Sequence, residues 1–319
     1  RVMQRAGMLK EGTLRHHYHF DGKWHDGISY SITRDMWMKS KRRLKVRVNS
    51  QEDLKRLARV RCFVLDMDGT IYLEDQLLEG SREFLDYIAD EDIRALFLTN
   101  NSSKCAQDYV EKLLSMGIGA LRQDVLTSGE AAADYVRREY GAVRVYVMGN
   151  ESLKDELRGA GIEVVEDRPD IVVAGFDTTM SYRSMTVVCD LMRQGLPLIA
   201  THPDFNCPVQ GGFVPDLGAM LAFIEASTGK RPDVVVGKPH EEIIRCIMHR
   251  TGLSKDHLAI VGDRLYTDIA TGANAGILSV LMLTGETKMQ DLETSDVQPD
   301  LVFENMQELR SVLAKAHRQ

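Results

Sequence analysis

The sequence predicts an α/β fold: a doubly wound parallel sheet that carries an inserted α/β cap domain. Short apolar runs, each ending in polar or turn-forming residues, alternate with helical segments from residue 61 onward. This is the pattern of buried parallel strands joined by crossover helices. The alternation restarts at about residue 143 in units whose strands do not end in Asp or Lys. We interpret these units as a second layer inserted into the first.

The expected elements follow in chain order, with apolar runs marking strands and Ser, Asn or Gly marking helix ends. The first half of the core has expected strands at 62–65, 95–98 and 125–127, a small hairpin over 69–78, and helices at 81–89, 104–116 and 128–140. The cap has expected strands at 143–148, 171–175 and 197–200, with helices at 151–160 and 181–194. The core then resumes with a helix at 216–228, strands at 234–236, 258–261 and 278–283, an edge strand at 300–302 and a final helix from 305.

These elements divide the 319 residues into four parts, since a chain of this length can build more than one domain. The core is formed by 61–144 and 217–319, and the cap by 145–216. Residues 41–60 are a basic linker that includes a capped helix start near Ser50. Residues 1–40 are a separate piece.

The N-terminal piece is expected to form two strands, at 13–20 and 27–32, joined by a turn at 21–23. This piece contains the sequence Lys-Trp-His-Asp at 23–26 and resembles the C-terminal tail of a GNAT-type N-acetyltransferase. The Gly-rich loop that would hold the pyrophosphate of acetyl-CoA is absent from this piece. We therefore expect no acetyl transfer from it.

The composition, 44% apolar and 27% charged with a net charge of −7, is typical of a globular protein. No apolar run approaches the roughly 20 residues of a membrane helix, and the first residues lack the apolar core of a signal peptide. We therefore expect a cytoplasmic protein without a membrane partner. The five cysteines include no C-x-x-C pair, which argues against structural zinc. Residues 1–60 are basic, but their charges are scattered among strand residues, so we expect no nucleic-acid partner.

Two carboxylates, Asp66 and Asp68, follow the first core strand in the stretch CFVLDMDGT at 62–70. Polar residues also follow three more strands: Thr99, Asn100 and Asn101 after the second, Lys238 after 234–236, and Asp263 and Asp268 after 258–261. Because chemistry in open parallel sheets sits beyond the carboxyl ends of the strands, we expect these side chains to gather at one edge. Such a set could hold a magnesium ion and a phosphate.

In this order the four motifs resemble those of the haloacid dehalogenase superfamily. The Thr-Asn-Asn and Gly-Lys-Pro motifs resemble those of its NagD-like, p-nitrophenyl-phosphatase subclass. The resemblance covers about residues 60–319. The resemblance implies a haloacid dehalogenase-like Rossmannoid core and a Mg²⁺-dependent phosphatase that hydrolyses a small phosphomonoester through an aspartyl-phosphate. Phosphoglycolate, glycerol 3-phosphate, pyridoxal phosphate, nucleoside monophosphates and sugar phosphates are the candidate substrates.

Each motif residue then has an expected role and a structural alternative. Asp66 is the candidate nucleophile and Asp68 the candidate general acid and base, although either could merely shape the loop after a strand. Asp66, the backbone carbonyl of Asp68, and Asp263 are the candidate Mg²⁺ ligands. Asp268 is expected in the outer shell, with a helix-start acid as its alternative. The candidate phosphate-binding residues are Thr99, Asn100, Asn101 and Lys238.

The loop after the last expected cap strand carries Asp204, Asn206 and Cys207. The resemblance implies that the cap covers the site and contacts the leaving group, so we expect these three residues to bind that part of the substrate. For Cys207 the alternative is a buried structural thiol. A homodimer formed through the cap stays open as a second partner.

Two other functions remain open. A phosphomutase would use the same fold and residues but return the phosphoryl group to substrate, and product analysis separates it from a phosphatase. A regulatory or binding module attached to an acetyltransferase would be marked by loss of a catalytic carboxylate, and none is lost here.

Overall fold

The computed structural model describes residues 9–20, 23–31, 49–209 and 211–318, and the chain divides into two units at 1–47 and 48–319. In the first unit, β1 (Leu9–Phe20) and β2 (Lys23–Ser31) form the antiparallel hairpin that the sequence predicts. Part of the basic linker lies outside the described residues. Its helix start is confirmed, because Ser50 caps α3 (Gln51–Leu57).

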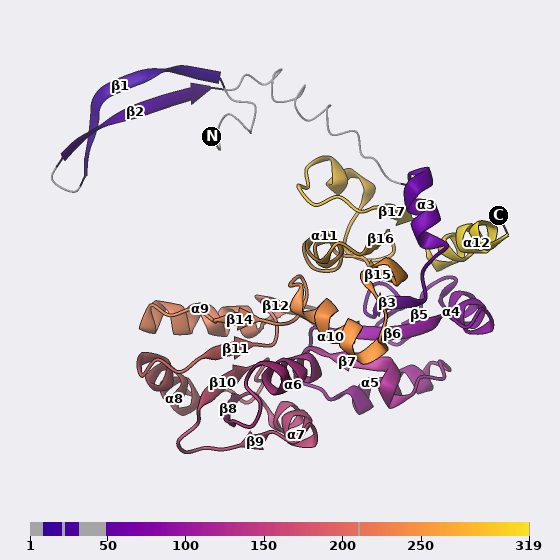
Figure 1. The fold of residues 1–319 in the computed structure, drawn as a ribbon, viewed down its shortest axis with the longest axis horizontal. Coiled ribbons are helices and arrows are strands. Elements are labelled where there is room, and N and C mark those ends of the chain that lie inside the picture. The colour runs from indigo at the N-terminus through magenta and orange to yellow at the C-terminus, as the bar shows by residue number, and fades with distance from the viewer. Residues whose placement is uncertain (1–8, 21–22, 32–48, 210, 319) are drawn as a thin grey trace. The chain divides into compact units, whose positions relative to one another are not determined.

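Six parallel strands form the core sheet of the second unit (Figure 1). In spatial order they are β17 (Leu301–Phe303), β16 (Leu278–Met282), β15 (Leu258–Gly262), β3 (Cys62–Asp66), β6 (Arg94–Thr99) and β7 (Val125–Thr127). One face of this sheet packs against α3, α4 (Ser81–Asp90), α5 (Ala106–Ser115) and α12 (Met306–His317). The parallel α/β core and its edge strand at β17 are therefore confirmed.

A second parallel sheet has five strands, as the sequence pattern of an inserted α/β layer indicates. In spatial order they are β14 (Val234–Val235), β11 (Leu198–Ala200), β10 (Ile171–Ala174), β8 (Arg144–Met148) and β9 (Glu163–Val164). Its outer face packs against α8 (Tyr182–Arg193) and α9 (Leu217–Thr228).

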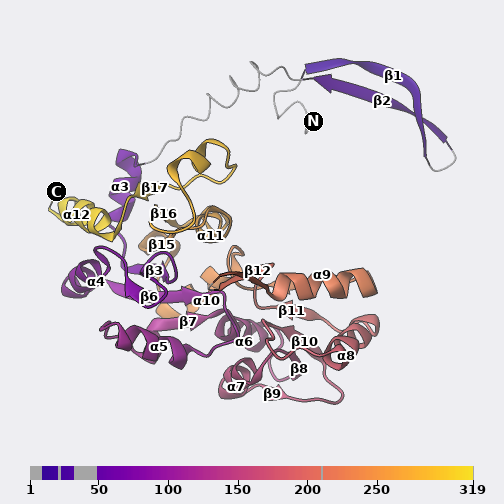
Figure 2. The same cartoon turned by 180° about the vertical axis from the view of Figure 1, so that it is seen from behind.

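One layer of helices lies between the two sheets, as the two views show (Figure 1, Figure 2). It consists of α6 (Ser128–Glu139), α7 (Glu151–Gly159) and α10 (Glu242–Thr251). Their apolar side chains form one continuous cluster that includes Val64 of the core sheet and Val147 of the second sheet. The sheets therefore share a hydrophobic core, and α11 (Ala270–Ala275) contributes to its edge.

The strand at 234–236 corrects a sequence expectation. It was expected in the core sheet, but β14 pairs with β11 of the second sheet. The helix before it, α9, packs against α8 in the same layer. An apolar run of three residues carries no information about which sheet it joins, so its partner could not be predicted. We therefore propose that the cap extends from about residue 144 to about residue 236.

Two small hairpins stand beyond the sheets. One, formed by β4 (Tyr72–Leu73) and β5 (Gln76–Leu77), is the hairpin expected after Asp68. The other, formed by β12 (Asn206–Val209) and β13 (Gly212–Pro215), replaces the expected cap loop. The remaining turns are η1 (Arg122–Asp124), η2 (Lys255–His257), the π-helical η3 (Leu265–Ile269) and η4 (Met289–Glu293). Among the described residues, no helix is long and apolar enough to cross a membrane.

Candidate active site

The first core strand delivers Asp66 to the floor of the site. β3 is a buried apolar run with Asp66 as its last residue. The chain then turns sharply, and the Tyr72 N–H donates to the Met67 carbonyl at 3.2 Å. Gly69 has φ +84°, and a Cβ atom there would lie 2.7 Å from Asp263 Oδ2. This turn therefore requires glycine.

Three carboxylates and one ammonium group meet beyond the core strands. Carboxylate oxygens of Asp66, Asp263 and Asp268 lie within 4.8 Å of one another. Lys238 Nζ donates to Asp66 and, at 2.7 Å, to Asp268 Oδ1. Both Lys238 and Asp268 are buried. The fold thus brings together four residues that the sequence had in three separate motifs.

The charges in this cluster perturb one another. Burial raises the pKa of Asp66 to about 7; Lys238 opposes that rise, and Asp268 and Asp263 add to it. Burial and the charge of Asp268 likewise raise the pKa of Asp263 to about 6. For Lys238, burial lowers the pKa, but the ion pairs with Asp268 and Asp66 outweigh burial and raise it. Three carboxylates against one ammonium leave an excess of negative charge that a divalent cation would balance.

The donor set fits a hard divalent cation. Asp263 is held in place because its Oδ2 accepts from the Glu286 N–H at 2.7 Å. Gly285 leaves room for it, since a Cβ atom there would lie 2.0 Å from Asp263 Oδ2. Asp268 Oδ1 instead accepts from Lys238 Nζ at 2.7 Å, and its outer-shell role stays a prediction. A few carboxylate oxygens, with space for water and a substrate oxygen, are what Mg²⁺ prefers.

Asn100 has a role that the sequence did not reveal. Its Nδ2 donates at 2.9 Å both to the Lys238 carbonyl and to Asp204 Oδ2, and its Oδ1 accepts from the Lys238 N–H at 2.9 Å. The side chain is buried. Asn100 therefore fixes the backbone of Lys238 and links it to Asp204, and its contact with a phosphoryl group stays a prediction.

Thr99 and Asn101 also make local hydrogen bonds. Thr99 Oγ1 accepts from the Asn101 N–H at 3.1 Å, and Asn101 Oδ1 accepts from the Ser103 N–H at 2.8 Å. These bonds shape the loop after β6. Both residues still line the active-site cavity, so their contact with a phosphoryl group stays a prediction.

A cavity of about 450 Å³ lies over this cluster, within the usual size of a small-ligand site. Nine of the predicted site residues line it: Asp66, Asp68, Thr99, Asn100, Asn101, Asp204, Asn206, Cys207 and Lys238. Asp263 and Asp268 are buried beside it. The cavity therefore joins the core strand ends to the β12–β13 hairpin of the cap.

Sequence reasoning missed several lining residues, among them Lys104, Lys112 and Tyr72. A signal was present, because α5 begins directly after the Thr-Asn-Asn loop and its first turns must face the same edge of the sheet. Arg264 also lines the cavity, and its Nε lies 3.1 Å from Glu286 Oε2.

A larger cavity, of about 790 Å³, lies near α4 and the start of β6. Arg61 and Arg94, which line it, stand at the amino ends of the core strands. It is therefore at the edge of the sheet opposite Asp66. No group of metal-ligating side chains of the described chain lies there, so we place the chemistry in the smaller cavity.

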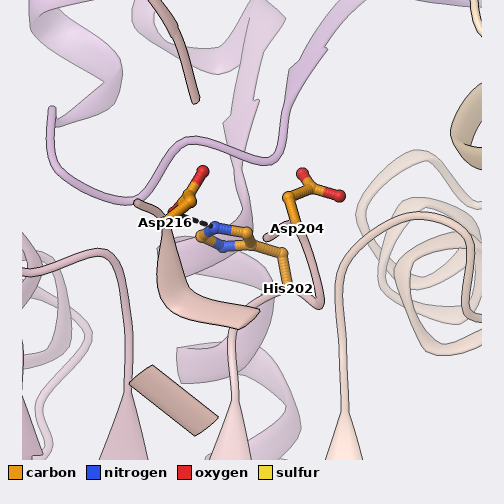
Figure 3. A group of neighbouring side chains, drawn as sticks. All are labelled: His202, Asp204 and Asp216. Carbon is orange, nitrogen blue, oxygen red and sulfur yellow. Dashed lines mark hydrogen bonds and ion pairs between the residues drawn. The ribbon is translucent and has the colours of Figure 1, made fainter. Parts of the chain in front are cut away.

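A second group of potential metal ligands, His202, Asp204 and Asp216, lies at the base of the β12–β13 hairpin (Figure 3). His202 is fully buried, with Nε2 2.9 Å from Asp216 Oδ1 and Nδ1 2.9 Å from Thr201 Oγ1. Asp204 points away from the imidazole in Figure 3 and accepts from Asn100.

Both imidazole nitrogens are thus engaged within the protein. A metal ion would have to break these bonds, so we interpret His202 and Asp216 as a clamp that closes the hairpin base. Cys207, inside the hairpin, is half-buried, and burial raises the pKa of its thiol. This favours a neutral thiol over a reactive thiolate.

Comparisons with known proteins agree with this geometry. Residues 63–163 match the model of the haloacid dehalogenase-like hydrolases, and residues 235–309 match a second, HAD-hydrolase-like model. An acid sugar phosphatase of Staphylococcus haemolyticus is 34% identical over 254 residues, which are 79% of this chain and 96% of that protein. The chain belongs to the haloacid dehalogenase-like hydrolases.

Solved structures of this family narrow the subclass. A 4-nitrophenylphosphatase from Thermotoga maritima is 46% identical, with a TM-score of 0.79 over 81% of this chain and 99% of that one. NagD from E. coli K-12 is 31% identical, with a TM-score of 0.73 over 78% and 98%. The chain is therefore a NagD-like phosphoric monoester hydrolase. Hydrolases of this family generally use a divalent metal, and the cluster around Asp66 could bind one.

Proposed function

We propose that this hydrolase is a Mg²⁺-dependent phosphatase that cleaves a small phosphomonoester through a phosphorylated Asp66. The observation that carries the proposal is the Lys238 ammonium held between Asp66 and Asp268 on the floor of the cavity. A carboxylate at a strand end, beside a fixed cation and two more carboxylates, is equipped for phosphoryl transfer.

In the first step, the Asp66 carboxylate attacks phosphorus, so that an Oδ–P bond forms while the bond from phosphorus to the ester oxygen breaks. Asp68 gives its proton to the departing oxygen. In the second step, Asp68 takes a proton from the water that attacks phospho-Asp66. Phosphate then leaves and the Asp66 carboxylate is restored.

The surroundings of Asp68 suit this role. It lines the cavity two residues from Asp66. Partial burial raises the pKa of the Asp68 carboxyl, and the positive charges of Lys112 and Arg264 oppose that rise. A raised pKa helps a carboxyl to hold the proton that the leaving group needs.

The remaining groups bind and orient. Lys238 binds the phosphoryl oxygens, with Thr99 and Asn101 as further donors, and Asn100 keeps the lysine in place. When bound by Asp66, Asp263 and the Asp68 carbonyl, Mg²⁺ would neutralise the repulsion between the attacking carboxylate and the phosphate.

The leaving group would be bound by Asp204, just before the β12–β13 hairpin, and by Asn206 and Cys207 of β12. The relatives named as acting on sugar phosphates and 4-nitrophenyl phosphate favour a small alcohol or phenol. A phosphomutase remains the alternative, and it would return the phosphoryl group to the substrate instead of releasing phosphate.

The test is turnover by the purified protein on a panel of small phosphomonoesters with Mg²⁺, with phosphate and alcohol both quantified. Asp66→Asn keeps nearly the same shape and should lower kcat by several orders of magnitude. Asp86→Asn, on the exposed face of α4, is the matched control. More than a few per cent of wild-type activity in folded Asp66→Asn would refute the covalent route.

A further inference from the structure

One wall of the active-site cavity is basic and has no assigned role. It is formed by Lys104, just before α5, and by Asp108 and Lys112 within that helix. Asp108 and Lys112 are four residues apart and share one helix face. The wall belongs to the same cavity as the Thr-Asn-Asn loop and Asp204.

The other cations of the cavity already have carboxylate partners. Lys238 is paired with Asp66 and Asp268, and Arg264 lies 3.1 Å from Glu286. A partner is missing only on the α5 wall: within the described part of the chain, no carboxylate lies within ion-pair distance of Lys104 or Lys112.

The acidic residue between the two lysines is used elsewhere. Asp108 Oδ2 accepts from the Cys105 N–H at 2.8 Å, which caps the start of α5. Lys112 Nζ instead lies 4.2 Å from the centroid of the Tyr72 ring. Two unpaired lysines in one cavity wall are notable in a chain with 47 acidic residues and a net charge of −7.

The position of the wall relates it to the leaving group. Lys112 lines the same cavity as Asp68 and lies over the ring of Tyr72, which forms a backbone bridge with Asp68. Asp68 is the residue proposed to protonate the departing oxygen, so Lys112 lies on the leaving-group side of the scissile bond. A group attached to the departing alcohol would meet the two lysines before it leaves the cavity.

We propose that Lys104 and Lys112 form a subsite for a second anionic group on the substrate. The preferred substrates are then phosphomonoesters whose leaving alcohol itself carries a carboxylate or a phosphate. This inference rests on the proposed phosphatase function and deepens it. It distinguishes the preferred substrates from phosphomonoesters whose leaving group carries no additional anionic group, such as 4-nitrophenyl phosphate, for which we expect the wall to be dispensable.

The test compares two esters of the same carbon skeleton. Glycerol 3-phosphate and 3-phosphoglycerate differ only at the carbon farthest from the phosphate. That carbon belongs to a hydroxymethyl group in glycerol 3-phosphate and to a carboxylate in 3-phosphoglycerate. Since a hydrogen bond to a charged group contributes about 1.5–3 kcal/mol, the carboxylate should raise kcat/KM at least about tenfold. The preference should fall as salt is added, because Lys104 is exposed.

Substitutions of the two lysines test whether they cause the preference for the anionic ester. Lys104→Gln and Lys112→Gln should each lower the ratio of kcat/KM between the two esters about tenfold, mainly through KM for the anionic one. Lys104→Arg should retain the ratio, because the charge is kept. Lys230→Gln, an exposed lysine outside the cavity, is the matched control. Circular dichroism checks that each variant is folded.

Glycerol 1,3-bisphosphate separates the two kinds of anion. A larger gain for the bisphosphate assigns the subsite to phosphate, and a larger gain for 3-phosphoglycerate assigns it to carboxylate. Equal kcat/KM for all three esters, or a ratio unchanged by both Gln variants, overturns the inference while leaving the phosphatase function intact. No hydrolysis of any ester, 4-nitrophenyl phosphate included, would instead refute the proposed function itself.

Discussion

The two parallel sheets are built alike but contribute differently to the site. Both consist of apolar strands covered on both faces by helices, and they share one helical layer. Carboxylates follow the core strands, at Asp66 and Asp263. The second sheet instead supplies Lys238, just beyond β14, and the hairpin that begins after β11.

We infer from this difference that the second sheet helps to position the proposed catalytic groups. The lysine that holds Asp66 comes from the edge of the second sheet, and Asn100 of the core fixes its backbone. Ser102, in the loop after β6, lies 3.2 Å from Thr201 at the end of β11. The carboxyl ends of both sheets therefore converge on one cavity.

Removing and restoring a divalent metal tests the proposed role of the core carboxylates. We expect a chelator to lower kcat by at least roughly a hundredfold, because the repulsion between the Asp66 cluster and a phosphate would be uncompensated. Mg²⁺ should restore activity, whereas Ca²⁺ should not, since it takes more ligands and could draw both Asp66 oxygens onto the metal. The measurement is phosphate release against free metal concentration. Full activity in excess chelator would contradict this account of the core.

Two variants test whether the cap binds the leaving group: one is in β12 and the other lies just before it. Asn206→Ala should raise KM for the preferred substrate about tenfold, with a smaller effect on 4-nitrophenyl phosphate. Asp204→Ala should impair both substrates, because it also removes the hydrogen bond to Asn100 and so loosens Lys238. The measurement is kcat/KM on both substrates. Proportional losses on both substrates in Asn206→Ala would mean that specificity is set elsewhere.

A substitution of Glu156 in α7 tests the buried contact that this helix makes between the two sheets. This buried side chain accepts from Thr127 Oγ1 at 2.8 Å and from the Ala106 N–H at 3.1 Å, and burial raises the pKa of its carboxyl to about 7. The folded state thus keeps a proton that the unfolded state loses near pH 4.5. The stability of the wild type therefore falls as pH rises from about 4.5 to 7.

Glu156→Gln should remove this loss. Its free energy of unfolding should exceed that of the wild type by up to about 3 kcal/mol above pH 7, and the two should agree below pH 4.5. Urea unfolding across this range measures the difference, with the exposed Glu163→Gln as control. A difference that does not depend on pH would refute the raised pKa.

Much of the core was predictable from sequence, because each of its motifs follows a strand that can only be buried. The apolar run at 62–65 fixes both the strand and the exit of Asp66 at its end. Because the carboxyl ends of parallel strands share one edge, Asp263 could be placed near Asp66 without knowing their distance. Lys238 was expected at the same edge, but its strand, β14, belongs to the second sheet, so the reason for its position was not predicted.

The rest depended on contacts that no local pattern encodes. β14 pairs with β11 of the second sheet, whereas the apolar run at 234–236 is compatible with both sheets. The expected contact of Asn100 with the phosphate stays a prediction. Its bonds to the backbone of Lys238, 138 residues away in sequence, could not be predicted. The β12–β13 hairpin lacks a run of apolar residues, so its strands gave no signal.

The central claim is that Asp66 of the core carries the phosphoryl group and that Lys238, from the second sheet, makes its transfer fast. Single-turnover reactions quenched with acid, followed by peptide mass spectrometry, measure this directly. We expect the Asp66 peptide to gain one phosphoryl group transiently in the wild type. In Lys238→Ala the same adduct should form roughly 10²–10³-fold more slowly, as when one donor to a developing charge is removed. Phosphorylation of another residue, or an equal rate without Lys238, would contradict the account.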